Sequence, residues 1–345
     1  MRKRVIGSSE ALRCVFAKIH KGANTNLFNR DEKLHRGEAP TPLEIIINAS
    51  SGTIGKVEIG DQLANLFRQG GIDARISLAR SGKQLVELAR RAANSDAATI
   101  VAGGGDGTIN AVASTLVDTG KTLGVLPLGT LNHFARDLGI PLDLQGAANN
   151  IIANHAVPID VGEVNGHIFL NNSSLGLYPS LVHEREQKQR LGHGKWPAFL
   201  RAALSVMRLY PFLDVRLSVD GREIVSRTPF VFIGNNEYEM ENFNIGRRAR
   251  LDGGELSLYF SHRTRRLGLV WLALRALMAR VRNAEEFVAM RTTEVSIETR
   301  RARIRVATDG EVLMMQSPLR YRLRPGALNV IVPARDFVGD IKELG

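Results

Sequence analysis

Cysteine is almost absent, since Cys14 is the one cysteine among 345 residues. A single thiol excludes an intrachain disulfide and fits a reducing compartment. No apolar run reaches the length of about 18–20 residues that a membrane span needs, and the nearest candidate, 267–279, is interrupted by Arg275. The N-terminus has basic residues but neither the apolar core nor the small-residue cleavage site of a signal peptide. We therefore expect a soluble, cytoplasmic protein.

Aromatic residues are also few, at 6% of the sequence. Acidic residues are fewer than basic ones, with 35 Asp and Glu against 46 Lys and Arg, which gives a net charge of +11. This surplus indicates an anionic partner, either lipid or nucleic acid. Zinc-ligand spacings, a recognition helix and aromatic-rich strands are missing, so we expect no nucleic-acid partner. A solvated basic face without a specific partner is the alternative. Much of the surplus comes from arginines of the second half: Arg247, Arg248, Arg250, Arg263, Arg265, Arg266, Arg275, Arg280, Arg282, Arg300, Arg301, Arg303 and Arg305.

The run 101–110, Val-Ala-Gly-Gly-Gly-Asp-Gly-Thr-Ile-Asn, is the strongest local signal. An apolar strand at 98–102 ends in a glycine turn, and a helical pattern follows from Ile109. Glycines at such a turn let the backbone approach a ligand closely, and the helix N-terminus favours an anion. Asp106 would repel a phosphate by itself. It therefore indicates a phosphate that arrives with Mg²⁺, or a hydrogen bond that orders the turn. A turn that only connects two elements is the alternative.

Two common nucleotide motifs do not fit this chain. A P-loop needs two glycines four residues apart, followed by Lys and Ser or Thr, and no such run occurs. The dinucleotide fingerprint needs a small residue three positions after its second glycine. Thr108 or Asn110 stands there, depending on the register.

A second run with the same architecture follows at 126–139, Leu-Pro-Leu-Gly-Thr-Leu-Asn-His-Phe-Ala-Arg-Asp-Leu-Gly. The pattern predicts a strand at 123–128, a glycine turn, and a short helix with Thr130 as its N-cap and Gly139 at its end. Two parallel strands that both deliver Gly-Thr to their carboxyl ends form one crevice.

Together the two runs resemble the diacylglycerol kinase catalytic domain superfamily, which includes bacterial soluble lipid kinases and the sphingosine and ceramide kinases. NAD kinases and phosphofructokinases share Gly-Gly-Asp-Gly-Thr more distantly. The resemblance runs from residue 43 to residue 333 and implies an ATP- and Mg²⁺-dependent kinase. The residues that it implies at the nucleotide are Asn48, Ser51, Gly52, Gly104, Gly105, Asp106, Gly107, Thr108, Thr130 and Asn132.

The resemblance also implies a catalytic carboxylate in Thr-Asp-Gly-Glu at 308–311. Asp309 and Glu311 share a face if both lie on a strand. We favour Glu311 as the base, with Asp309 orienting it or assisting the metal, although Asp309-Gly310 also fits a plain hairpin turn. Gly253 stands where relatives often have an aspartate of a Mg²⁺ site, and Asp252 is its candidate substitute.

The order of strand, helix and turn patterns along the chain predicts the fold. Alternating strands and helices at 43–158 predict a doubly wound parallel α/β domain, similar to NAD kinases and phosphofructokinases. Turn signals at Asn165-Gly166, Asp220-Gly221 and Pro325-Gly326 predict a β-rich, mainly antiparallel second domain at 159–333. Residues 1–42 are expected to form a basic arm and linker, and residues 334–345 a tail that can pack back on the first domain.

The sequence thus favours an ATP- and Mg²⁺-dependent lipid kinase with a diacylglycerol-like acceptor, peripheral at the inner face of the membrane. Its partner would be a lipid substrate at an anionic surface, with homo-oligomerisation left open. Apolar stretches at 196–209 and 267–281, and an amphipathic pattern from Leu12 to Ile19, are core or lipid-facing elements. The alternatives are a kinase of a soluble hydroxyl acceptor and a non-catalytic lipid- or nucleotide-binding regulator.

Overall fold

A computed structural model describes residues 43–49, 56–176, 212–241, 244–248, 250–261 and 287–334. Ser51 and Gly52, the apolar stretches at 196–209 and 267–281, the arm at 1–42 and the tail from residue 335 onward lie outside the described residues. Every described residue belongs to one compact unit, Pro40–Gly345.

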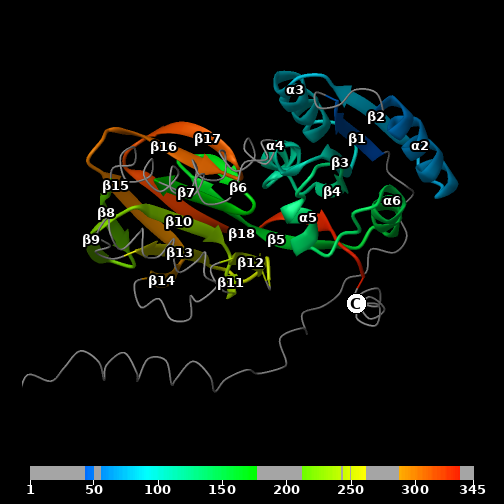
Figure 1. Cartoon of the computed structure of the whole chain (residues 1–345). Helices are drawn as coiled ribbons and strands as arrows, with labels where there is room; N and C mark the ends of the chain where they lie inside the picture. The colour runs from blue at the N-terminus through cyan, green and yellow to red at the C-terminus, as the bar shows by residue number, and fades with distance from the viewer. Residues whose placement is uncertain are drawn as a thin grey trace, which may run out of the picture. The chain divides into compact units, whose positions relative to one another are not determined.

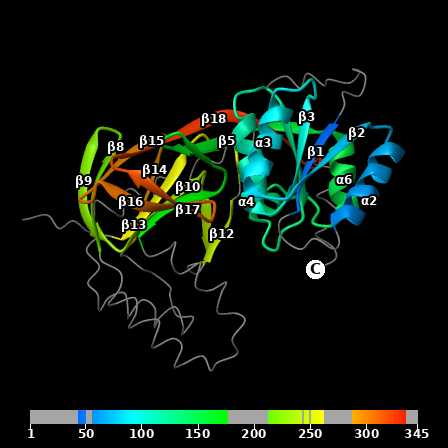
Figure 2. The same ribbon diagram turned by 90° about the horizontal axis from the view of Figure 1, so that it is seen from above.

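Strands and helices alternate through the first part of this unit. The strands run parallel in the order β2-β1-β3-β4, with α3 and α4 on one face of the sheet and α2 and α6 on the other (Figure 1, Figure 2). The elements are β1 (Leu43–Asn48), α2 (Lys56–Gln69), β2 (Ala74–Ala79), α3 (Gly82–Ala93), β3 (Thr99–Gly104), α4 (Asp106–Leu116), β4 (Thr122–Pro127), α5 (His133–Asp137) and α6 (Leu144–Ala153). The predicted doubly wound domain is confirmed.

Apolar spacing explains how the helices attach to the sheet. Helix α4 buries Ile109, Val112, Ala113 and Leu116, which recur every three or four residues and so form one stripe. This stripe packs into a core with Ile100 and other side chains on one face of the sheet. On the other face, Leu63 and Phe67 of α2 enter a second core with β1 and α6. Each fully buried side chain of this size contributes about 1.5–3 kcal/mol.

The second part consists of strands. They are β5 (Ala156–Val164), β6 (His167–Phe169), β7 (Asn172–Gly176), β8 (Leu213–Val219), β9 (Arg222–Thr228), β10 (Phe230–Asn235), β11 (Tyr238–Glu241), β12 (Asn244–Arg248), β13 (Leu256–Ser261), β14 (Phe287–Thr292), β15 (Glu294–Thr299), β16 (Arg303–Thr308), β17 (Glu311–Gln316) and β18 (Leu319–Ile331). Six of them form an antiparallel sheet in the order β14-β13-β10-β7-β16-β17. Its inner face shares a core with β8, β15 and β18. The predicted β-rich, mainly antiparallel part is confirmed.

Strand β18 connects the two parts through one sheet. It pairs in parallel with β4 near its end and antiparallel with β5 and β15, which yields a ten-stranded sheet (Figure 1). The hairpin predicted at Pro325-Gly326 is therefore wrong. The pairing with β5 shifts register between Arg324 and Leu328, and Gly326 has a φ of 58° there. A bulge uses the same residue types as a turn, which explains the misleading signal.

The other predicted turns occupy tight hairpins. Asn165-Gly166 connects β5 with β6, and Asp220-Gly221 connects β8 with β9, all with positive φ. The domain boundary predicted at 158/159 falls within β5. Among the described residues, no helix is long and apolar enough to span a membrane.

Candidate active site

The carboxyl ends of β1, β3 and β4 meet at one edge of the parallel sheet. The turns after β3 and β4 touch there, since a Cβ atom on Gly129 would lie 2.4 Å from the Cα of Gly105. At the end of β1, the Asn48 side chain donates a hydrogen bond of 2.9 Å to Oγ1 of Thr108. A Cβ atom on Gly104 would lie 2.5 Å from that same hydroxyl oxygen. Only glycine therefore fits at positions 104 and 129.

A cavity of about 620 Å³ opens at this edge. It brings together seven of the predicted site residues, which lie far apart in the sequence. They are Asn48, Gly104, Gly105, Gly107, Thr108, Thr130 and Glu311, with Gly129, Leu128 and α3 residues completing the wall. Ser51 and Gly52 lie outside the described residues.

Glu311 is the exposed carboxylate of this cavity. It begins β17, directly after the Asp309-Gly310 turn, and a Cβ atom on Gly107 would lie 3.8 Å from its Oε1. The same side chain lines a second cavity of about 550 Å³, whose wall includes Asn110, His167 and Thr308. Glu311 therefore stands where two adjoining cavities meet, beside the glycine turn.

Asp309 lines neither cavity and anchors the hairpin. Its carboxylate accepts hydrogen bonds from the backbone N–H groups of Leu170 (2.6 Å), Asn171 (2.8 Å) and Asn172 (3.0 Å). Burial raises the pKa of Asp309 to about 6, while these N–H donors and the Arg248 guanidinium lower it in part. Asp309-Gly310 does form the turn of the β16–β17 hairpin, and the Asp309 carboxylate also fixes this hairpin to the loop before β7.

Asp106 has a comparable anchoring position in the glycine turn. Its two carboxylate oxygens accept the backbone N–H groups of His133 (3.1 Å) and Phe134 (3.0 Å) at the start of α5. The prediction of Thr130 as the N-cap is wrong, because α5 begins after Asn132, which has a φ of 51° and no side-chain capping bond. The cap comes instead from Asp106 on the neighbouring turn, which sequence spacing within one segment does not reveal.

Asn132 holds its own turn together. Its amide nitrogen donates to the carbonyl oxygens of Pro127 (3.2 Å) and Gly129 (2.9 Å), and its Oδ1 accepts the N–H of Gly129 (3.0 Å). Both amide hydrogens are thus used within the turn. The structure gives Asn132 a supporting position next to the cavity that Thr130 lines.

The candidate metal ligand Asp252 is neutralised by a neighbour. Nε and Nη2 of Arg250 contact its two oxygens at 3.0 and 3.2 Å. Gly253 lies tightly against Asn236, whose Oδ1 would be 2.7 Å from a Cβ atom at that position. No group of three or more His, Cys, Asp or Glu side chains among the described residues could hold a metal ion. Mg²⁺ in phosphoryl-transfer sites usually takes only one or two carboxylates besides water and phosphate oxygens, so Asp252 stays a prediction as a metal ligand.

Arg248, one of the arginines of the basic surplus in the second half of the chain, supports the site from a buried position. Its side chain is 0% exposed and pairs with Asp137 of α5 at 2.8 Å. It also donates to the carbonyl oxygens of Leu170 and Asn235 and to Oδ1 of Asn171. Arg248 thus connects α5, whose start Asp106 caps, with the loop that Asp309 anchors. Its arginine-rich surroundings gave no signal that this one guanidinium is buried.

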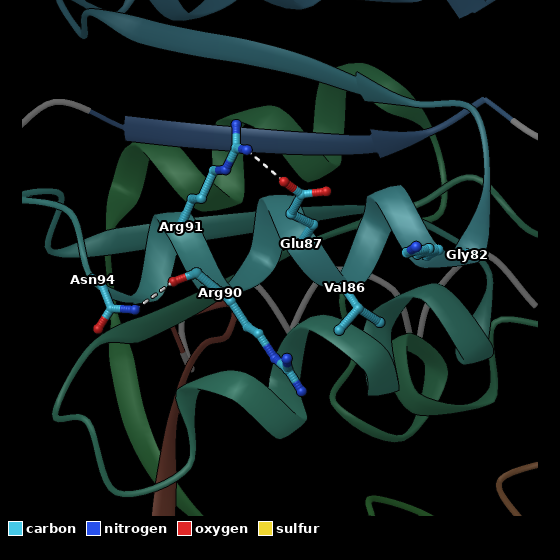
Figure 3. A pocket seen from close by; sticks show the side chains of 7 residues that line it. Gly82, Val86, Glu87, Arg90, Arg91 and Asn94 are labelled. Atoms are coloured by element: carbon cyan, nitrogen blue, oxygen red, sulfur yellow. Dashed lines mark hydrogen bonds and ion pairs between the residues drawn. The ribbon is translucent and has the colours of Figure 1, made fainter.

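A groove along the outside of α3 adjoins these cavities through Gly82 and Val86. Figure 3 shows Glu87 and Arg91 paired on one side of this helix, while Arg90 extends in the other direction. Arg90 also lines the second cavity beside Glu311. The groove itself contains none of the predicted site residues.

Comparison with known proteins finds a match for each of the two parts of the fold. Residues 42–164 match the diacylglycerol kinase catalytic domain, and residues 177–332 match the YegS C-terminal NAD kinase beta sandwich-like domain. The two matches together span most of the chain, including both glycine turns and Glu311. The first part of the chain thus contains the catalytic domain of the diacylglycerol kinase family.

Individual relatives of this diacylglycerol kinase family are moderately similar. A Bacillus subtilis (strain 168) protein named diacylglycerol kinase is 36% identical over 182 residues, which cover 52% of this chain and 59% of that protein. A Staphylococcus aureus (strain Newman) diacylglycerol kinase is 29% identical over 217 residues, which cover 62% of this chain and 68% of that one. The match thus spans less than two thirds of the Bacillus subtilis protein.

The fold is shared with a solved structure. A diacylglycerol kinase from Bacillus anthracis str. Sterne superimposes with a TM-score of 0.65 at 22% identity, covering 85% of this chain and 97% of that chain. This likeness confirms that the parallel-sheet part and the β-rich part occur together in one fold.

Proposed function

We propose that this protein transfers the γ-phosphate of ATP to the hydroxyl of a diacylglycerol-like lipid, in a Mg²⁺-dependent reaction. One observation supports the proposal most: the exposed carboxylate of Glu311 lies beside Gly107 in the turn that the sequence predicts at the phosphates. The match to the diacylglycerol kinase catalytic domain supports a kinase, and the names of the relatives support a diacylglycerol-like acceptor. We place the protein at the inner face of a membrane, where such a lipid resides.

Phosphoryl transfer needs mainly positioning and charge neutralisation from a protein. Backbone N–H groups at the start of α4, with the side chains of Asn48, Thr108 and Thr130, would bind the phosphates in the 620 Å³ cavity. Glu311 would accept the proton of the acceptor hydroxyl. The hydroxyl oxygen forms a bond to the γ-phosphorus, the bond from that phosphorus to the bridging oxygen breaks, and ADP leaves.

The two anchored aspartates hold the glycine turn and Glu311 in position. Asp106 fixes the glycine turn to α5, and Asp309 fixes the hairpin that bears Glu311. Mg²⁺ bound to ATP would neutralise phosphate charge. We propose that phosphate oxygens and water hold most of the coordination sphere of this ion, as is common for Mg²⁺ at nucleotides.

The test is transfer of labelled γ-phosphate from ATP to lipids in mixed micelles, with and without Mg²⁺. The panel contains diacylglycerol, monoacylglycerol, phosphatidylglycerol, ceramide and sphingosine, with a Glu311→Ala variant as the control for contaminating kinase. A Mg²⁺-dependent phospholipid product, absent with the variant, is the expected result.

Other outcomes point to the alternatives. ATP binding without transfer to any lipid would contradict the lipid acceptor and favour a soluble acceptor or a regulator. Absence of ATP binding would contradict the assignment of the 620 Å³ cavity to the nucleotide.

A further inference from the structure

Strand β17 exposes apolar side chains on one face of a sheet edge. It is the last strand of the six-stranded sheet, next to β16 (Figure 1). Val312 and Met314 alternate with inward-facing residues and are 51% and 61% exposed, whereas Met315 belongs to the core. Exposed apolar side chains that lie together on one face, rather than singly, indicate a candidate interaction surface.

Arginines of β16 share this outer face. The antiparallel register places Arg305 opposite Met314 and Ala307 opposite Val312, so these side chains project from the same side of the hairpin. Arg303 occupies the same face one pair further along, opposite Gln316. The bend before β16 adds two more exposed arginines, Arg300 and Arg301.

These four arginines lack acidic partners in the part of the chain that the structure describes. Several other arginines of the β-rich part have such partners: Arg216, Arg227, Arg248, Arg291, Arg322 and Arg324. The outer face of the β16–β17 hairpin is therefore a patch of positive charge around exposed apolar side chains.

We propose that the outer face of the β16–β17 hairpin docks on the surface of a bilayer that contains anionic phospholipid. Arginine guanidinium groups attract anionic headgroups, and Val312 and Met314 would leave water among the acyl chains. A single-stranded nucleic acid fits this face less well, because the face has no aromatic side chain on which a base could stack. Charge complementarity and exposed apolar area therefore favour a lipid surface.

The position of the hairpin relates this surface to the site. Glu311 adjoins Val312, and Met314 follows about 10 Å further along the strand. Docking would bring the hairpin that bears Glu311 to the membrane, where a lipid acceptor resides. This consequence rests on the proposed function, whereas the docking itself does not.

The chain offers a matched control on another sheet edge. Val225 of β9 is 70% exposed and lies opposite Arg216 of β8, much as Met314 lies opposite Arg305. There, however, Arg216 and Arg227 have Glu223 and Asp214 as acidic partners. The outer faces of the two hairpins share this geometry, but among the described residues acidic partners offset the arginines only on β8–β9.

The experiment measures co-sedimentation of the full chain, without nucleotide, with phosphatidylcholine vesicles and with vesicles that also contain phosphatidylglycerol. Wild type is expected to bind the anionic vesicles at low salt and to dissociate as salt rises. Arg303→Gln/Arg305→Gln should weaken binding about 30-fold, from the loss of two charges. Val312→Ser/Met314→Ser should also weaken it. The control Arg216→Gln/Arg227→Gln should bind as wild type does.

The proposal is overturned if the control Arg216→Gln/Arg227→Gln loses as much vesicle binding as Arg303→Gln/Arg305→Gln does. It is also overturned if the hairpin variants bind anionic vesicles as wild type does, or if wild type does not bind them. Binding to an oligonucleotide in preference to vesicles would do the same. Phosphorylation of a short-chain, dispersed diacylglycerol separates this inference from the proposed function. Hairpin variants should retain that reaction while losing phosphorylation of vesicle-bound acceptor. If wild type does not phosphorylate the dispersed diacylglycerol, that result contradicts the proposed function. The vesicle co-sedimentation then still tests the docking proposal independently.

Discussion

Glu311 and Gly107 lie in contact range although most of the chain separates them, with 3.8 Å between Oε1 of Glu311 and the position of a Cβ atom on Gly107. This relationship brings the only exposed carboxylate of the 620 Å³ cavity, among the described residues, to the glycine turn. It is the geometry on which the proposed chemistry depends most.

Glu311→Gln tests that chemistry directly. The amide keeps the size of the side chain but cannot take the proton, so we expect kcat to fall about 10²- to 10⁴-fold with ATP affinity retained. Steady-state transfer and equilibrium ATP binding measure the two quantities. Glu298→Gln, on an exposed position of β15 outside both cavities, should leave transfer unchanged. Full turnover by Glu311→Gln would contradict its assignment as base.

Asp106→Ala tests the cap that joins the two turns. Loss of both acceptors for the His133 and Phe134 N–H groups should lower the free energy of unfolding by about 0.5–2 kcal/mol and should abolish transfer. Asp143→Ala is the matched control, because Asp143 caps α6 by accepting the Gly146 N–H at 2.7 Å, away from the cavity. It should cost similar stability while transfer persists. Equal transfer by both variants would contradict a site function of Asp106.

Two arginine–aspartate pairs of opposite exposure provide a further test. Arg248→Met would leave buried Asp137 unpaired, so we expect the free energy of unfolding to fall by about 3–5 kcal/mol. Arg250→Met breaks the exposed pair with Asp252 and should cost at most about 1 kcal/mol. Denaturant titration of both variants gives the comparison, and similar losses would show that Arg248 does not support the site as inferred.

The pH dependence of stability should report Asp309. Its folded-state pKa of about 6 lies above the ordinary value of 3.8, so the folded protein holds this proton more tightly than the unfolded chain does. The resulting stabilisation is fully present below pH 3.8 and is lost as pH rises through 6. Asp309→Asn removes this contribution. The free energy of unfolding of the variant, relative to wild type, should therefore rise between these pH values.

Urea unfolding across that pH range measures the difference. Asp96→Asn, at a position whose side chain is 72% exposed, serves as the control and should run parallel to wild type. A difference between Asp309→Asn and wild type that stays constant with pH would refute the raised pKa.

Gly129→Ala tests the contact between the two glycine turns. The added Cβ would meet the Cα of Gly105 at 2.4 Å, so the turns must separate. We expect a loss of about 1–3 kcal/mol in stability, as overpacking typically costs, and weaker ATP binding. Gly60→Ala in α2 meets nothing within 4 Å and should stabilise by about 0.5–1 kcal/mol. Calorimetric ATP titration and thermal unfolding distinguish the two, and unchanged ATP affinity in Gly129→Ala would count against a nucleotide at this edge.

Local patterns predicted most of the fold. The pattern of apolar strands that end in glycine turns predicted β3 and β4 correctly. Three of the four dipeptide turn signals mark hairpins, namely Asn165-Gly166, Asp220-Gly221 and Asp309-Gly310. The Pro325-Gly326 signal failed because a bulge within β18 uses the same backbone freedom as a turn. The identities of the site residues stay predictions, and the structure adds that Asn48, Thr108, Thr130 and Glu311 line one cavity.

The sequence by itself determined the alternation of strands and helices in the first part, the β-rich character of the second part and the two glycine turns, because periodicity and turn chemistry depend on near neighbours in the chain. Only the tertiary structure decided what each charged group does. Asp106 caps the helix that follows the neighbouring turn, and Arg248 is buried and pairs with Asp137. Asp309 anchors its hairpin, while Glu311 is exposed. Hydrogen bonding and desolvation act between residues that folding brings together, so a linear pattern of charges does not distinguish these functions.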